Sequence, residues 1–398
     1  MVIKQTCPLH TETDQELAWK NILSPQVAAT LFTRQLLRDK EADPPMRASV
    51  DIREDQVSQS RDILMFYKRL EVDWARPLHC VLEGDPAVGV GVQRHYFNLA
   101  ISKLQHGFNI KNMIYITMLF EGEQDHLLPA TSEAVLEIDL FIVAGRMIGH
   151  SFLHGGPRLY GLSEAIIHML IHGDIDTATV TLADVPDYDL RDTIEMLDGD
   201  DELIDQQREE INTLALSRDL SPVCPENCRW LHQKLLEHGV IVRRLRQIKQ
   251  LKKGLKDTKV LTLLQERPDT AQILFPRSAS AMPDAQATLS QIVWPGEDSD
   301  RDDDTSCPVN VQIQTAGFLR RFIETASPSR LGQLIQFWIG WEIPTGKLTV
   351  KVEKGGYLKA STCFSNLHVP GHFDCFEDFS NHVQSCCIDT CGTGFGLV

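Results

Sequence analysis

The sequence predicts an α+β protein in which a larger, mostly helical lobe is joined by a flexible hinge to a small α/β lobe. Three observations lead to this prediction. Apolar residues recur at helical spacing over much of the chain between residues 92 and 264. Residues 276–308 are rich in proline, serine and acids, so they cannot bury enough apolar surface to order themselves. Residues 311–398 then combine short strand-like runs with helical patterns.

The start of the chain predicts little regular structure. Residues 1–55 show no sustained period and contain a Pro-Pro step, so we expect a partly ordered lead-in. We expect the larger lobe to span residues 56–296. Its first elements should be a strand over residues 78–82, a glycine-rich turn, and a helix over residues 92–104.

The rest of the larger lobe is expected to be helical. One long helix over residues 132–147 and a second over residues 163–173 each begin at a serine, a residue type that caps helix N-termini. The acidic stretch 191–212 should also be helical. The region 230–264 carries an apolar stripe at helical spacing, made of Ile241, Leu245, Ile248, Leu251 and Leu255.

The face opposite that stripe is basic. A solvated helix face is the favoured interpretation, and a surface for a partner or for nuclear import is the alternative. The basic face consists of Arg243, Arg244, Arg246, Lys249, Lys252, Lys253 and Lys256.

Residues 297–310 are the predicted acidic hinge, because residues 297–304 contain six acids and one arginine. The small lobe should then span residues 311–398. Its expected elements are helices near 318–325, 331–338 and 375–383, a strand over 348–352, and the segment 357–370.

Charge and hydropathy exclude several functions. The net charge of −16 argues against general affinity for nucleic acid. The apolar run Leu140–Gly145 is far shorter than a membrane span, and Met1–His10 contains no apolar segment of a secretion signal. We therefore expect an intracellular protein of the cytoplasm or nucleus that contacts neither membrane nor nucleic acid. In that setting the ten cysteines should be free thiols, one of which could act as a nucleophile.

Four features at the end of the chain, taken in order, carry a resemblance. They are the run Leu331–Gly340, the loop Thr362-Cys363-Phe364, the segment Leu367–Pro370, and the aromatic Phe395 near the end of the sequence. As an ordered set they resemble the carboxyl-terminal lobe of the HECT-type ubiquitin-protein ligases. In the larger lobe, Trp74–Phe97 more faintly resembles the opening strand, turn and helix of that family.

The resemblance implies a bilobal HECT-like α+β fold and a specific chemistry. Cys363 would accept ubiquitin from a ubiquitin-conjugating enzyme as a thioester and pass it to a lysine of an unknown protein substrate. Thr362 would act as a supporting donor and Phe395 would anchor the C-terminal tail. The chemistry requires no cofactor and no metal. The acidic hinge would let the small lobe swing.

The chain also departs from the family. Ser361 and Ser365 replace the histidine and asparagine that usually flank the Thr-Cys-Phe motif, and His368 occupies a position that is usually acidic. The family's β-rich subdomain that grips the conjugating enzyme has no recognisable counterpart here. The alternative function is therefore a catalytically decayed HECT-like scaffold that binds ubiquitin or a conjugating enzyme without transfer.

Other signals have plainer interpretations. Three groups of residues have a spacing that would suit zinc ligands: His150/His154, His168/His172 and Cys224/Cys228/His232. Each group lacks a complete ligand set, so we expect these residues to be structural. A cysteine-protease dyad of Cys363 with His368 or His372 explains less of the chain than ubiquitin transfer does.

Overall fold

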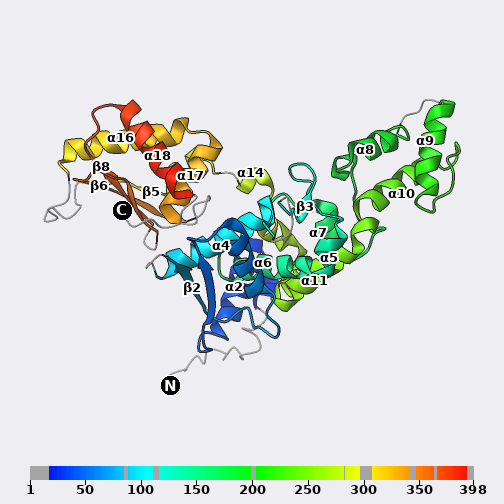
Figure 1. Ribbon diagram of the computed structural model, residues 1–398, viewed down its shortest axis with the longest axis horizontal. Coiled ribbons are helices and arrows are strands. Elements are labelled where there is room, and N and C mark those ends of the chain that lie inside the picture. The colour runs from blue at the N-terminus through cyan, green and yellow to red at the C-terminus, as the bar shows by residue number, and fades with distance from the viewer. Residues whose placement is uncertain are drawn as a thin grey trace, which may run out of the picture. The chain divides into compact units, whose positions relative to one another are not determined.

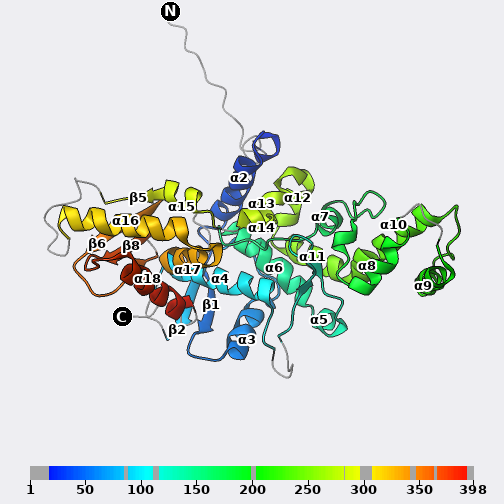
Figure 2. The ribbon, with the colours of Figure 1, turned by 90° about the horizontal axis from the view of Figure 1, so that it is seen from above.

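The computed structural model is an α+β protein, as the sequence predicts. It describes residues 18–84, 88–110, 116–198, 203–281, 283–295, 307–340, 347–362 and 365–391. By internal contacts the chain forms two compact units, each assembled from separate stretches of sequence. Figures 1 and 2 show the helices and strands of the chain, coloured by residue number. The first combines residues 1–44, 70–77 and 118–277, and the second combines residues 45–69, 78–117 and 278–398.

The first unit is mostly helical. Its longer elements are α2 (Pro25–Arg38), α5 (Glu133–Glu137), α6 (Leu140–Leu153), α7 (Glu164–Ile171), α8 (Tyr188–Glu195), α9 (Asp205–Leu216), α10 (Cys228–Val240), α11 (Leu245–Asp257) and α12 (Val260–Glu266). Its short elements are η1 (Ala18–Asn21), β3 (Phe120–Glu121), β4 (Leu128–Pro129), η2 (Leu182–Asp184), η3 (Val242–Arg244), η4 (Pro268–Thr270) and α13 (Ala271–Leu274).

The core of this unit is the crossing of α6 and α11, where glycines let the two backbones touch. A Cβ atom on Gly254 would lie 2.1 Å from the carbonyl oxygen of Ile142, and one on Gly145 would lie 2.4 Å from that of Leu251. Side chains of ordinary size cannot fit at these two positions. Every residue of α6 is buried, so this helix forms the centre around which the others pack.

The predicted helix over 132–147 is in fact two helices. Asp139 adopts a left-handed conformation, with φ of 58°, which ends α5 and lets α6 begin in a new direction. The predicted helix at residue 163 is confirmed as α7, because the Ser163 side chain accepts a hydrogen bond from the N–H of Ala165.

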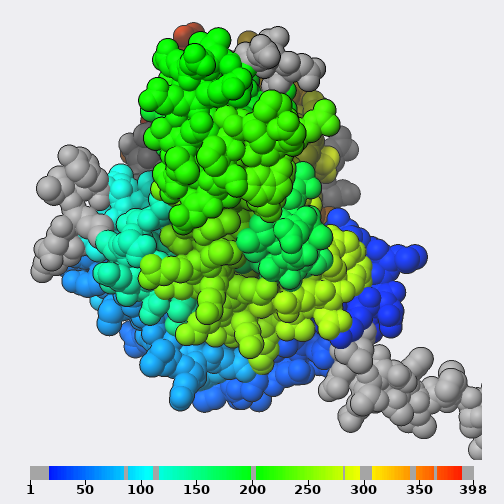
Figure 3. Space-filling view, turned by 90° about the vertical axis from the view of Figure 1, so that its right-hand side faces the viewer, coloured from blue at the N-terminus to red at the C-terminus, as the bar shows by residue number. Residues whose placement is uncertain are grey.

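The predicted region 191–212 contains the end of α8, which stops at Glu195, and most of α9, which begins at Asp205, and the region 230–264 contains η3 and α11 together with most of α10 and of α12. Within the first unit, α8, α9 and α10 gather at one end, and α10 leads through η3 into α11 (Figures 1 and 3). One residue was assigned wrongly to the solvated basic face. Arg244 is 1% exposed and donates to the carbonyl oxygen of Pro129 and to Glu121. Its position in η3, outside the regular turns of α11, turns it inward.

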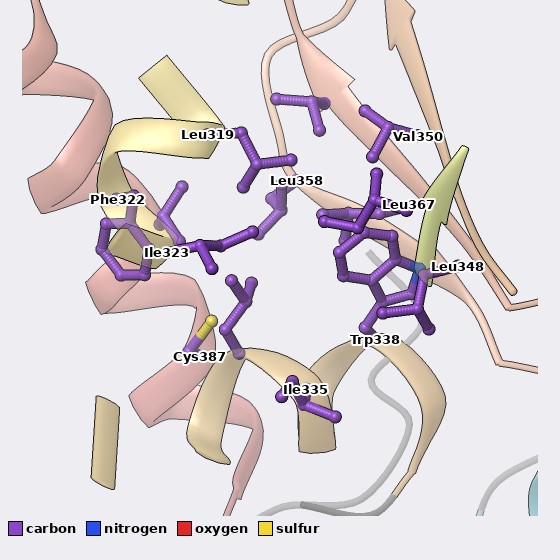
Figure 4. Close-up of a cluster of buried hydrophobic side chains, with 14 of the residues drawn as sticks. Leu319, Phe322, Ile323, Ile335, Trp338, Leu348, Val350, Leu358, Leu367 and Cys387 are labelled. Carbon is purple, nitrogen blue, oxygen red and sulfur yellow. The ribbon is translucent and has the colours of Figure 1, made fainter. Parts of the chain in front are cut away.

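The second unit contains a four-stranded sheet covered by helices. The strand order is β5 (Ile292–Val293), β6 (Leu348–Glu353), β8 (Asn366–Pro370) and β7 (Lys359–Ser361), with only the β7–β8 pair antiparallel. Helices α16 (Val309–Thr325), α17 (Pro328–Ile339) and α18 (Phe376–Cys391) pack with it. Their shared core includes Leu319, Ile335, Trp338, Val350 and Leu367 (Figure 4).

The same unit includes two strands from early in the chain. Strand β1 (Met46–Asp51) pairs in parallel with β2 (Leu78–Glu83), and α3 (Gln56–Tyr67) and α4 (Val90–His106) flank the pair. Strand β2 and helix α4 match the predicted strand over 78–82 and helix over 92–104, whereas the sequence predicts no element over residues 18–55. That stretch in fact contains η1, α2 and β1. Strand β1 is only six residues long, and its partner comes from elsewhere in the chain.

The stretch 276–308, which the sequence predicts to be a linker too polar to order itself, is partly regular. It contains α14 (Ser278–Ala281), α15 (Ala285–Gln291) and β5, and β5 joins the sheet by pairing with β6. Asp284 caps α15 by accepting a hydrogen bond from the N–H of Ala287. Most of the acidic hinge lies outside the described residues. Over the described ranges, no helix is both long enough and apolar enough to cross a membrane.

Candidate functional site

Hydrogen bonds to the backbone of Thr362 hold the N-terminal side of the connection between β7 and β8. This residue is 7% exposed, and its carbonyl oxygen accepts a hydrogen bond from Arg94 Nη1 of α4 at 3.1 Å. The N–H of Ser365 donates to the same oxygen at 3.4 Å. The predicted supporting donor is therefore a buried residue whose backbone is fixed. Cys363, Phe364 and Phe395 lie outside the described residues.

The loop is fastened on its C-terminal side through Ser365. Its carbonyl oxygen accepts from Trp338 Nε1 at 2.9 Å and from the N–H of Thr349 at 2.9 Å. Trp338 is fully buried in the core beneath the sheet (Figure 4). Ser365 itself has a left-handed backbone, with φ of 54°, a conformation that asparagine and glycine adopt more readily than serine. The two flanks of Cys363 are thus tied to α4, α17 and β6.

Three polar side chains form a chain of contacts on the outer face of the sheet, beside this loop. His368 Nδ1 lies 2.6 Å from Glu353 Oε1, and His368 Nε2 lies 3.4 Å from Ser361 Oγ. The three residues belong to the neighbouring strands β6, β8 and β7. The side chains of His368 and Glu353 are 20% and 30% exposed, so solvent and a ligand can reach them.

This arrangement favours one proton position on the imidazole. A carboxylate next to Nδ1 accepts the Nδ1 proton, which leaves Nε2 of the neutral ring as the acceptor. A neutral imidazole held in this way can take a proton from a nearby donor, and one residue, Ser361, separates it along the surface from the Thr362 backbone.

Of the residues around this loop, the sequence predicts Thr362 as a supporting donor, and His368 enters only as a departure from the family and as a protease alternative. Arg94 and Trp338 lie in the resembling segments Trp74–Phe97 and Leu331–Gly340 but receive no role from the sequence, and Glu353 is not predicted at all. Arg94 is 268 residues away from Thr362 in the chain, so no local pattern links them. Glu353 could have been found from the alternation along β6, because Thr349, Lys351 and Glu353 share the less buried face.

The candidate zinc pairs have other partners in the structure. His150 is fully buried and packs against Trp74, and His154 Nε2 donates to the carbonyl oxygen of Trp74 at 3.0 Å. His168 Nε2 lies 3.0 Å from Thr177 Oγ1. Cys228 Sγ donates to the carbonyl oxygen of Cys224 at 3.2 Å. In the part of the chain that the structure describes, no three His, Cys, Asp or Glu side chains gather as metal ligands.

The described thiols differ in burial. Burial raises the pKa of Cys80 to about 12, so its thiolate is scarce at neutral pH. Burial also raises the pKa of Cys307, and Cys387 lies in the core of the second unit. Cys224 and Cys375 are exposed and are the natural comparison thiols in any test of Cys363.

Comparison with known proteins adds the following. No protein-family model matches the chain. The chain is 29% identical over 161 residues to the G2/M phase-specific E3 ubiquitin-protein ligase of Gallus gallus, a match that covers 39% of this chain and 21% of the relative. It is 30% identical over 155 residues to the proteins of the same name from Macaca fascicularis and Homo sapiens, covering 38% of this chain and 22% of each relative. The chain thus spans about a fifth of the length of these curated relatives.

Proposed function

We propose that this chain is a HECT-type ubiquitin-protein ligase that carries ubiquitin on Cys363. The observation that carries the proposal is the Thr-Cys-Phe motif in a loop whose two flanking carbonyl oxygens, those of Thr362 and Ser365, are each held by a side-chain donor. The sequence relatives named as E3 ubiquitin-protein ligases support it independently.

The chemistry proceeds in two steps. The Cys363 thiolate attacks the thioester carbonyl of a loaded ubiquitin-conjugating enzyme, a bond forms to Cys363, and the thiolate of the conjugating enzyme leaves. The amine of a substrate lysine then attacks the new thioester and displaces Cys363, which forms an isopeptide bond. Because the first exchange replaces one thioester by another, the protein mainly has to supply an accessible thiolate in the correct position.

The second step releases a proton from the attacking amine. We assign its acceptance to His368 Nε2, with Glu353 as the residue that positions the imidazole. HECT-type ligases usually have a histidine at the position of Ser361 and an acid at the position of His368, so the proposed proton acceptor differs from theirs. Thr362 supports the loop and Phe395 anchors the tail, as the resemblance implies.

The test is a loading assay. The full chain is mixed with ubiquitin, activating enzyme, ATP and a panel of conjugating enzymes, and the products are separated with and without reducing agent. We expect a thiol-sensitive ubiquitin adduct on the wild type that is absent in Cys363→Ala. In Cys363→Ser, an adduct stable to thiol but cleaved by hydroxide should form. Cys375→Ala, which removes an exposed thiol of the same unit, is the matched control and should load normally.

The result also decides between the two functions that the sequence suggests. An adduct that persists in Cys363→Ala excludes Cys363 as the carrier. If no conjugating enzyme loads the wild type while ubiquitin or a conjugating enzyme still binds, the chain is the decayed scaffold.

A further inference from the structure

A basic groove lies in the first unit, between the α5–α6 junction and helices α11 and α12. It encloses about 780 Å³. Helices α11 and α12 form the yellow-green surface below the α8–α10 region in Figure 3. The groove is built from residues of the first unit alone. Its lining includes Leu136, Asp139, Ile142, Gln250 and Leu261, together with Arg246, Lys249, Lys252, Lys253 and Lys256.

The positive charge of this groove is concentrated and mostly unpaired. Lys249, Lys252, Lys253 and Lys256 follow one another at intervals of three, one and three residues, so they share one side of α11. Within the described ranges, none of these four lysines has a carboxylate within 4.0 Å. Arg246 pairs with Glu133 at 2.9 Å, and the carboxylate in the lining, Asp139, accepts from Gln250.

Such a cluster opposes folding. Like charges three or four residues apart on a helix repel one another and destabilise it. The rest of the molecule is strongly acidic, since the whole chain carries −16. A helix that carries such unfavourable like-charge spacing is expected where its surface binds a ligand of opposite charge.

The floor of the groove is apolar. Leu136, Ile142 and Leu261 are each at most 7% exposed yet line the groove. The aliphatic stems of the lysines extend this apolar surface while their ammonium groups reach solvent. The ligand should therefore combine negative charge with apolar side chains.

We propose that this groove binds an acidic segment of a partner protein whose apolar side chains are spaced to lie on one face of a helix. Its carboxylates would pair with the lysines of α11 and its apolar residues would contact the floor. Nucleic acid fits less well, because no Phe, Tyr or Trp lines the groove to stack on bases, and the net charge repels a phosphate backbone. The proposal concerns a surface of the first unit and is independent of the chemistry at Cys363.

The test measures binding of the full chain to a fluorescein-labelled peptide of about four helical turns, with leucines on one face and glutamates elsewhere. Fluorescence anisotropy should show saturable binding that weakens with salt. The double variant Lys249→Glu/Lys253→Glu changes two exposed side chains and should weaken binding by about tenfold or more. Lys249→Gln/Lys253→Gln should lie between it and the wild type.

Controls separate this groove from general charge effects. Arg34→Glu/Lys68→Glu makes the same charge change at two exposed residues outside the groove and should leave binding unchanged. Peptides with Leu→Ser or Glu→Gln throughout should each bind less well. The proposal is overturned if the peptide does not bind, if both double charge reversals weaken it equally, or if a labelled single-stranded oligonucleotide or a vesicle containing anionic phospholipid binds the groove and the peptide does not.

Discussion

His368 Nδ1 lies 2.6 Å from Glu353 Oε1, across the pairing of the parallel strands β6 and β8. The carboxylate thereby fixes the ring so that Nε2 faces Ser361 on the next strand. His368 belongs to β8, the strand that follows residues 363 and 364 in the chain. In the proposed mechanism its imidazole is the proton acceptor, in place of the histidine and the acid that HECT-type ligases usually have around the motif.

Removing either member of the pair should slow transfer to lysine while leaving loading intact. We expect His368→Gln to lower the single-turnover rate of ubiquitin transfer from Cys363 to free lysine by about 100-fold, because a general base contributes roughly that much. Glu353→Gln should lower it by about tenfold, because the imidazole stays but loses its orientation.

The matched control for this experiment is His79→Gln, which removes an exposed histidine on β2. Its transfer rate should equal that of the wild type. An unchanged transfer rate in His368→Gln would falsify the assignment of His368 as proton acceptor.

Arg94 should be needed for the position of the loop more than for stability. Arg94→Met keeps the aliphatic stem but removes the donor to the Thr362 carbonyl oxygen, which costs roughly 1 kcal/mol at a partly buried site. We expect faster amide hydrogen exchange at residues 361–366 and slower loading of Cys363, with a small change in melting temperature. Gln93→Ala, the neighbouring substitution on α4, should change none of these. Equal exchange in Arg94→Met and the wild type would show that the contact does not order the loop.

Gly254→Ala should strongly destabilise the first unit. The added Cβ atom would lie 2.1 Å from the Ile142 carbonyl oxygen and 2.8 Å from the Arg146 nitrogen, both backbone atoms of α6. Forcing the helices apart should lower the free energy of unfolding by about 2 kcal/mol or more, as measured by urea denaturation. The control is Gly317→Ala in α16, where nothing lies within 4 Å of the added atom. That change should be stabilising by about 0.5–1 kcal/mol. Similar effects at the two sites would mean that α6 and α11 do not touch there.

Stability should fall on the acid side of neutrality because of two buried histidines. Burial and then the neighbouring His154 hold the pKa of His150 well below its usual range, and burial lowers the pKa of His154 despite its bond to the Trp74 carbonyl oxygen. In the unfolded chain both rings protonate below about pH 6.5. Between the folded and unfolded pKa values the unfolded state binds more protons, so stability decreases as pH falls.

This effect can be isolated with His150→Leu. Each such group contributes at most about 1.4 kcal/mol per pH unit. The loss of stability between pH 7.5 and pH 5.5, measured by thermal unfolding, should therefore be smaller in the variant than in the wild type. His79→Gln, at an exposed position, should retain the full loss. A wild-type slope in His150→Leu would rule out His150 as its source.

The helices that were predicted correctly have their own local signals. Ser163 caps α7, and the apolar stripe of α11 coincides with its buried face at Ile248, Leu251 and Leu255. The errors occur where a distant contact decides the structure. Arg244 turns inward to reach Glu121, and β5 is a strand only because it pairs with β6. Neither partner is close in sequence, so composition alone suggested a solvated helix face and a linker.

The residues of the candidate site also fall into those that a local sequence pattern predicts and those that only contacts between distant segments reveal. Cys363, Thr362 and Phe395 follow from an ordered motif set near the end of the chain, and their roles stay predictions. Arg94 and Glu353 could not be found from that motif set because they belong to α4 and β6. Trp338 lies within its run Leu331–Gly340, but its role follows only from the hydrogen bond that it donates to Ser365. Ser365 shows how a sequence pattern and the structure are related. HECT-type ligases usually have asparagine at this position, and asparagine suits the left-handed backbone that Ser365 adopts here.

The hydrogen bond from Arg94 to Thr362 joins an early and a late segment of the chain, which affects how the chain folds during translation and how a C-terminal fragment would behave. During translation, residues 45–117 emerge long before residues 278–398, yet both belong to the second unit. Residues 45–117 therefore cannot complete their packing until residues 278–398 have been synthesised, and until then they are accessible to chaperones and proteases. A fragment that begins after the acidic run would contain the Thr-Cys-Phe motif without the guanidinium that holds its backbone. We expect such a fragment to load ubiquitin less well than the full chain, so the cysteine-bearing lobe should not be assayed on its own.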